Sequence, residues 1–191
     1  MGTQLSDDAG IALLINTVST IFALALLITI LGPISGAHFN PAVSLVQLAQ
    51  KQQGVALTVF YIIAQSLGAI FGAIVANFMF DLNALQISQH ERVTSGTLLG
   101  EVIATAGLVI VIRTLIDRKQ DSIIAVSVAA WIGSAYFFTS STSFANPAVT
   151  IGRIFSDTFA GIAPASVMPF IAAQLVGAAI GLVAAKAISV R

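Results

Sequence analysis

The chain of 191 residues consists mainly of long apolar stretches separated by short polar connections. Five stretches reach, or nearly reach, the length of about 20 apolar residues that a helix needs to cross a bilayer. They cover residues 11–31, 55–80, 98–116, 123–138 and 167–190. Only 8% of the residues are charged, against about 25% in a soluble domain. The pattern therefore predicts an all-α membrane protein with five spans.

Two shorter apolar segments, residues 41–49 and 147–155, follow the first and fourth spans. Both begin with the same tripeptide, Asn40-Pro41-Ala42 and Asn146-Pro147-Ala148. Asn is a favoured N-cap and Pro a favoured first helical residue, so each tripeptide predicts a helix start. Such short helices occur at membrane depth only when they are buried in protein or line a watery cavity. We therefore expect two re-entrant half-helices whose positive N-termini meet at mid-membrane.

A second repeated pattern lies in the spans themselves. Ala64-Gln65-x-x-Gly68-Ala69-x-x-Gly72 matches Ala173-Gln174-x-x-Gly177-Ala178-x-x-Gly181. Small residues at this spacing let helix backbones approach each other closely in lipid. We therefore predict a single membrane domain over residues 1–191, built from a first repeat (1–80) and a second repeat (94–191).

The basic residues suggest how the chain is oriented. With the N-terminus outside, only Arg92 and Arg153 lie outside, and the other six basic residues face the cytoplasm: Lys51, Arg113, Arg118, Lys119, Lys186 and Arg191. This distribution obeys the positive-inside rule. The two repeats then enter the membrane from opposite faces, as an inverted duplication.

The balance of charges and the lack of Cys exclude several functions. Eight basic and eight acidic residues give no net charge, so no basic patch indicates nucleic-acid binding. The absence of Cys removes disulfides, thiol catalysis and thiolate metal sites. We expect no enzyme activity, no metal and no cofactor.

The segment Gly36-Ala37-His38-Phe39-Asn40-Pro41-Ala42-Val43 and its partner Asn146-Pro147-Ala148 resemble the paired motifs of the aquaporin, or major intrinsic protein, family. The resemblance covers essentially the whole chain. It implies a homotetramer in the cell membrane, surrounded by lipid, in which each subunit passively conducts water or small uncharged solutes. Asn40 and Asn146 would donate amide hydrogens into the pore. An acceptor ladder would be formed by the backbone carbonyls of Gly36, Ala37, His38, Thr142, Ser143 and Phe144.

The first departure from the family pattern concerns a helix. In the family each repeat begins with a helix that carries a buried Glu, and Glu101 matches that residue in the second repeat. The counterpart in the first repeat would fall before Met1, so the chain resembles a member without its first helix. We expect Glu101 to be a structural buried acid.

The second departure concerns the selectivity filter, where Val149 stands in place of the family's Arg. Matching the other filter positions by their distance from the two Asn residues gives Thr20, Ser134 and Ser143. This filter would be wide, weakly polar and uncharged, which suits a solute of glycerol size. The surrounding residues resemble an aquaglyceroporin branch associated with arsenite.

Arg153 lies four residues after Val149, on the same face of the half-helix. It could act as a displaced filter charge, or it could pair with Asp157 at i+4; we favour the ion pair.

Two alternative functions also remain. A gradient-coupled secondary transporter would need an ionisable group at its site, for which Glu101 is the candidate. The other alternative is a non-conducting membrane scaffold.

Overall fold

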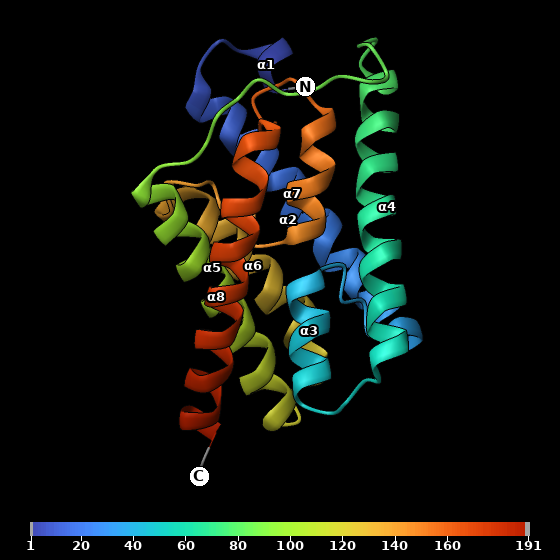
Figure 1. The fold of residues 1–191 in the computed structure, drawn as a ribbon, viewed down its shortest axis with the longest axis vertical. Coiled ribbons are helices and arrows are strands. Elements are labelled where there is room, and N and C mark those ends of the chain that lie inside the picture. Colours follow the sequence, from blue (N-terminus) through green and yellow to red (C-terminus); the bar gives the residue numbers. More distant parts are fainter. Residues whose placement is uncertain (1, 190–191) are drawn as a thin grey trace.

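The computed structural model describes residues 2–189, which form helices and no strands (Figure 1). The five predicted spans are confirmed. They are α2 (Ala9–Ser35), α4 (Val55–Met79), α5 (Ser95–Asp117), α6 (Ile124–Phe138) and α8 (Pro164–Ser189). The short helix α1 (Gly2–Leu5) precedes α2, and a 3-10 turn, η1 (Asp121–Ile123), leads into α6. Val190, expected in the last span, and Arg191, expected on the cytoplasmic side, lie outside the described residues.

The two short apolar segments form helices that start at the predicted prolines. The first is α3 (Pro41–Ala49), and the second is α7 (Pro147–Gly152), which continues as the 3-10 turn η2 (Arg153–Phe155). Both half-helices start near the middle of the molecule and run toward opposite ends (Figure 1). Their N-termini therefore face each other, as an inverted arrangement requires.

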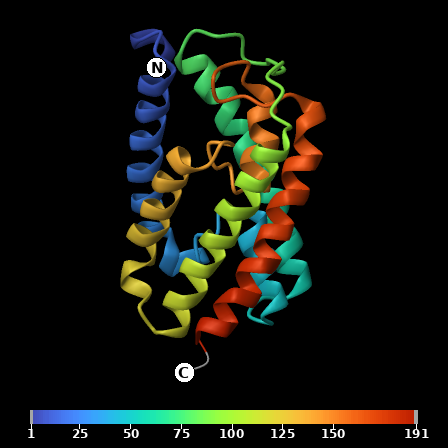
Figure 2. The same ribbon diagram turned by 90° about the vertical axis from the view of Figure 1, so that its left-hand side faces the viewer.

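The spans pack in pairs around these half-helices (Figure 2). Helix α2 packs against α6, and α5 packs along α8 and also contacts α6. Both half-helices, α3 and α7, pack against α4. The outward faces are strongly apolar; on α4, for example, Phe60, Phe71 and Phe78 are 65%, 68% and 65% exposed. Such a surface can be covered by lipid or by other spans.

The repeated glycines are in close contact with another helix in only one of the two repeats. A Cβ on Gly177 would lie 2.4 Å from the Val102 carbonyl oxygen, and one on Gly181 would lie 2.4 Å from that of Ala106. These glycines therefore let α8 pack directly against the α5 backbone. The corresponding Gly68 and Gly72 on α4 have no such neighbour within 4 Å. That face of α4 is open.

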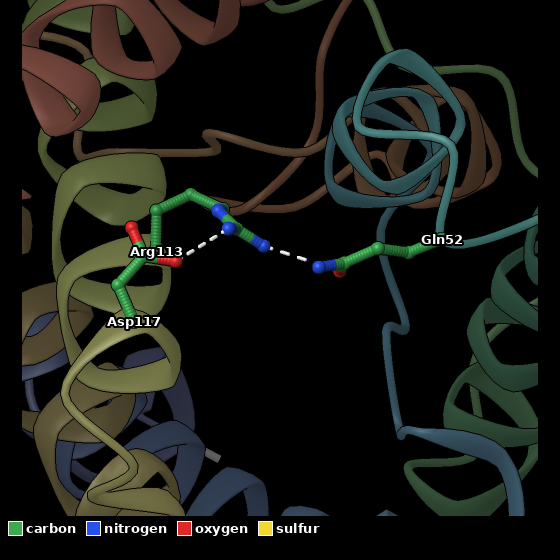
Figure 3. Close-up of polar contacts among 3 residues, drawn as sticks. All are labelled: Gln52, Arg113 and Asp117. Atoms are coloured by element: carbon green, nitrogen blue, oxygen red, sulfur yellow. Dashed lines mark hydrogen bonds and ion pairs between the residues drawn. The ribbon is translucent and has the colours of Figure 1, made fainter.

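Arg113 anchors the segment that follows α3 (Figure 3). Its Nη1 donates to Gln52 Oε1 at 3.1 Å, and its Nη2 donates to Asp117 Oδ1 at 2.6 Å. The C-terminal ends of α3, α5 and α8 all lie at the end of the molecule opposite the N-terminus (Figure 1). The contact with Gln52 thus ties the end of the first half-helix to α5.

Candidate functional site

The loops that precede the two half-helices have the same backbone conformation. Ala37 and Ser143, three residues before each Asn, have φ of 46° and 49°. Phe39 and Ala145, directly before each Asn, have φ of 48° and 47°. Left-handed conformations at alternate positions are uncommon for residues other than Gly. Their recurrence at equivalent places shows that the two loops are built alike, although their sequences differ.

Asn40 and Asn146 cap their own helices and also bind each other's loop. Their Oδ1 atoms accept from the backbone N–H of Ala42 and Ala148, each at 3.0 Å. Asn40 Nδ2 donates to the Ala145 carbonyl at 2.7 Å, and Asn146 Nδ2 donates to the Phe39 carbonyl at 2.8 Å. Each amide nitrogen has two hydrogens. One hydrogen of each therefore joins the half-helices, and the other is left for a solute.

Glu101 holds the second loop in place. Its Oε1 accepts from the Phe144 N–H at 2.9 Å, and its Oε2 accepts from the Ala145 N–H at 2.8 Å. Gln174 Nε2 donates to Glu101 Oε2 at 2.6 Å and to Thr150 Oγ1 at 2.9 Å. Glu101 and Gln174 are completely buried. This network links α5, α7 and α8 to the loop, and both carboxylate oxygens are engaged in it.

The first loop has a matching Gln and a matching hydroxyl, Gln65 and Ser44, but no carboxylate that corresponds to Glu101. Gln65 Nε2 donates to Ser44 Oγ at 3.0 Å, and Ser44 Oγ lies 3.1 Å from His38 Nδ1. Within the described residues, the backbone N–H groups of His38 and Phe39 donate no hydrogen bond. Gln65 Oε1 is also buried and unpaired. The two repeats thus share their loop geometry, but only the second has an anionic anchor.

A cavity of about 520 Å³ extends along the two loops. Its wall includes the side chains of α2, α5 and α6, the two Asn residues, and the outward turns of α7 and η2. The predicted site residues on this wall are Thr20, Gly36, Ala37, His38, Asn40, Ser143, Phe144, Asn146 and Val149. Pro41, Ala42, Pro147 and Ala148 are buried behind it as the first turns of α3 and α7.

The six carbonyl groups proposed as an acceptor ladder have no donor from the described part of the chain. Five of those residues line the cavity, and Thr142 does not. By contrast, the carbonyls of Phe39 and Ala145 are occupied by the two Asn side chains. Five residues whose carbonyl groups have no donor within the described residues therefore line the cavity, in the two loops that precede Asn40 and Asn146.

Ser134 is not brought to the cavity. It is exposed, and its hydroxyl donates to the Ala130 carbonyl of its own helix at 2.9 Å. The cavity face of α6 instead carries residues at every fourth position: Ile124, Val128, Ile132 and Tyr136. A shift of two residues turns a helical side chain by about 200°. The sequence shows this apolar stripe, which ends at Tyr136. Matching the filter position by its distance from the Asn residues selected Ser134 instead.

Arg153 also lines the cavity, and the expected pair with Asp157 is wrong. Arg153 Nη2 donates to Tyr136 Oη at 3.2 Å, and its Cζ lies 4.2 Å from the centre of the Phe144 ring. Asp157 Oδ1 accepts from the Gln89 N–H instead. The physical reason is that α7 ends at Gly152 and η2 at Phe155. Asp157 therefore lies beyond the helix, where i,i+4 neighbours no longer share a face.

A second guanidinium group lies near the same aromatic ring. Arg92 Cζ is 5.0 Å from the Phe144 centroid. Its Nε and Nη2 donate to the carbonyls of Gly161 and Phe159 at 2.6 and 2.7 Å. Burial, and then the charge of Arg153, lower the pKa of Arg92 to about 10. Arg92 therefore remains protonated at neutral pH, and it adds a positive charge behind Phe144 to that of Arg153 on the cavity wall.

Comparison with known proteins gives consistent matches. A profile of the family described as "Major intrinsic protein" matches residues 2–144. Aquaglyceroporin AqpS of Rhizobium meliloti (strain 1021) is 43% identical over 182 residues, which are 95% of this chain and 78% of that protein. Aquaporin-4 of Mus musculus is 32% identical over 140 residues, 68% of this chain and 43% of that protein. Aquaporin-5 of Rattus norvegicus is 35% identical over 112 residues, 55% of this chain and 42% of that protein. In these matches the chain spans less than half the length of the two mammalian relatives.

Proposed function

Because this chain belongs to the major intrinsic protein family, and is thus a passive channel for water and small solutes, we propose that its pore follows the cavity past Asn40 and Asn146. The observation that carries this proposal is the reciprocal hydrogen bonding of the two Asn side chains. It fixes both half-helix N-termini beside a cavity whose lining includes five of the six residues proposed for the acceptor ladder. The repeats, residues 1–80 and 94–191, each supply one half of this centre.

The mechanism needs no covalent chemistry. Each half-helix places roughly half an elementary positive charge at its N-terminus. A passing water or hydroxyl group accepts from the remaining N–H of Asn40 or Asn146 and donates to the carbonyls on either side. The same positive ends raise the energy of a cation at this point. Neutral solutes exchange one set of hydrogen bonds for another, so the barrier to their passage is low.

The solutes that we propose are uncharged and of glycerol size. At the level of the family's filter, Val149, Thr20 and Ser143 line the cavity, and none of the three is charged. A relative over nearly the whole chain is called an aquaglyceroporin. Arsenite, which at neutral pH is a neutral trihydroxy species, presents hydroxyl groups much as glycerol does and is included in the proposal.

We also assign an assembly and an orientation. The chain would form homotetramers in the cell membrane, with its N-terminus outside. Support comes from the apolar outer faces of the spans and from the cations at the ends of α3, α5 and α8. Under the positive-inside rule those ends face the cytoplasm.

A coupled transporter is disfavoured by the state of Glu101. Both of its oxygens accept hydrogen bonds within a fully buried network, and it does not line the cavity. It is therefore not a free group that could bind an ion with each solute.

The test is solute entry into proteoliposomes, followed by stopped-flow light scattering for water and glycerol and by trapped arsenic for arsenite. We expect flux that does not saturate and does not change when a proton or sodium gradient is imposed. Dependence on a gradient would indicate the transporter, and permeability equal to that of empty liposomes would indicate the non-conducting scaffold.

A further inference from the structure

Arg153 extends the cavity wall outward from Val149. Both residues line the cavity, and Arg153 follows Val149 by one helical turn on the side of the half-helix away from the Asn pair. Its guanidinium group is held from two sides, by the Tyr136 hydroxyl at 3.2 Å and by the face of Phe144 at 4.2 Å. A cation in such a setting is fixed in place.

A chain of polar groups connects Arg153 to the opposite wall. Tyr136 Oη accepts from Arg153 and in turn lies 3.4 Å from Thr20 Oγ1 as a donor. The chain therefore joins η2, α6 and α2, and all three residues line the cavity.

No carboxylate neutralises Arg153 within the described residues, where the only ion pair joins Arg113 and Asp117. A second positive charge lies close to Arg153, because Arg92 approaches the same Phe144 ring. A charge without an ion-pair partner on the wall of a cavity inside the protein acts strongly on an ion in that cavity, since the effective dielectric constant there is lower than in water.

We infer that Arg153 is the charged filter residue of this channel, displaced one turn outward from position 149. This inference rests on the proposed function and adds a specificity-determining residue to it. The guanidinium group repels cations and donates hydrogen bonds to solute hydroxyls. Val149 meanwhile leaves the passage wide at the level where a charged side chain would narrow it. The displacement thus combines cation rejection with room for a polyol.

The experiment compares variants by the ratio of K⁺ current in planar bilayers to glycerol permeability in proteoliposomes. Arg153→Gln removes the charge and keeps a hydrogen-bond donor, whereas Arg153→Lys keeps the charge and loses the planar fork. Arg118→Gln, at an exposed position after α5, is the control for the same change in net charge. The double variant Val149→Arg/Arg153→Gln returns a cation to the neighbouring turn.

We expect Arg153→Gln to raise the ratio at least about tenfold, the effect of removing a unit charge a few ångströms from the ion path. Arg153→Lys and Arg118→Gln should stay near the parent ratio, and the double variant should return toward it. An unchanged ratio in Arg153→Gln, or a Lys variant that leaks as much as the Gln variant, contradicts the inference alone. A parent chain that passes no glycerol contradicts the proposed function itself, and with it this inference.

Discussion

Asn40 and Asn146 each donate a hydrogen bond to the backbone carbonyl that precedes the other, at 2.7 and 2.8 Å. Two residues more than a hundred positions apart thereby fix the relative position of two half-helices. Each Asn also caps its own helix. A single side chain therefore caps a helix, joins it to the other half-helix and keeps one N–H for a solute.

Replacing Asn146 by Asp should harm cation exclusion more than replacing it by Ala. Asp keeps an oxygen to cap Ala148 but adds a negative charge where two positive helix ends meet. Ala loses the cap, at a cost of about 0.5–2 kcal/mol, without attracting cations. The measurement is proton and K⁺ current in planar bilayers. Equal leaks in the two variants would show that the helix dipoles do not exclude cations.

Val149→Arg should narrow the pore. A planar, charged side chain would then face Thr20 and Ser143 on the cavity wall. Glycerol and arsenite permeability should fall by a larger factor than water permeability in the same proteoliposomes. A parallel loss of all three, or no loss, would mean that position 149 does not form the constriction.

Gly177→Ala should destabilise the chain, whereas Gly68→Ala should not. A Cβ at Gly177 meets the Val102 carbonyl oxygen at 2.4 Å, and overpacking of this kind costs about 1–3 kcal/mol. At the equivalent Gly68 nothing lies within 4 Å, so Ala there should be neutral or slightly favourable for the helix. Thermal unfolding in detergent compares the two. Equal destabilisation would show that the face of α4 is covered as closely as that of α8.

Glu101→Gln should loosen the second loop. The Gln side chain offers one acceptor oxygen, so one of the N–H groups of Phe144 and Ala145 loses its partner. An unpaired buried donor costs about 1–3 kcal/mol. We expect a lower unfolding temperature and lower glycerol flux. Glu91→Gln, at an exposed loop position, is the control and should change neither the unfolding temperature nor the flux. Equal effects of the two substitutions would show that Glu101 does not hold the loop in place.

The sequence predicted the half-helices well because their start signals are local. Asn and Pro at each N-terminus set the first turn, and α3 covers the predicted residues Pro41–Ala49. The all-α fold with five spans was predictable from apolar length alone.

The side chains on the cavity wall were harder to predict, because they depend on rotation of a helix about its axis. Ser134 and Tyr136 are two residues apart, and only Tyr136 faces the cavity. The partner of Arg153 depended on where α7 ends. Because the helix stops at Gly152 and the 3-10 turn at Phe155, Asp157 does not lie on the same helical face and binds the Gln89 N–H instead. The apolar stripe of α6 is visible in the sequence, but the packing of the helices decides which face of α6 meets the cavity.

The most direct test of the proposed pore uses the absence of Cys from the 191 residues of this chain. Ser143→Cys and Ser134→Cys are matched substitutions, one on the cavity wall and one on the outer face of α6. We predict that mercuric ion abolishes most of the glycerol flux of proteoliposomes carrying Ser143→Cys, with recovery on adding a thiol, and leaves Ser134→Cys unaffected. Block at Ser134→Cys, or continued flux through a labelled Ser143→Cys, would contradict a pore that runs past Asn40 and Asn146.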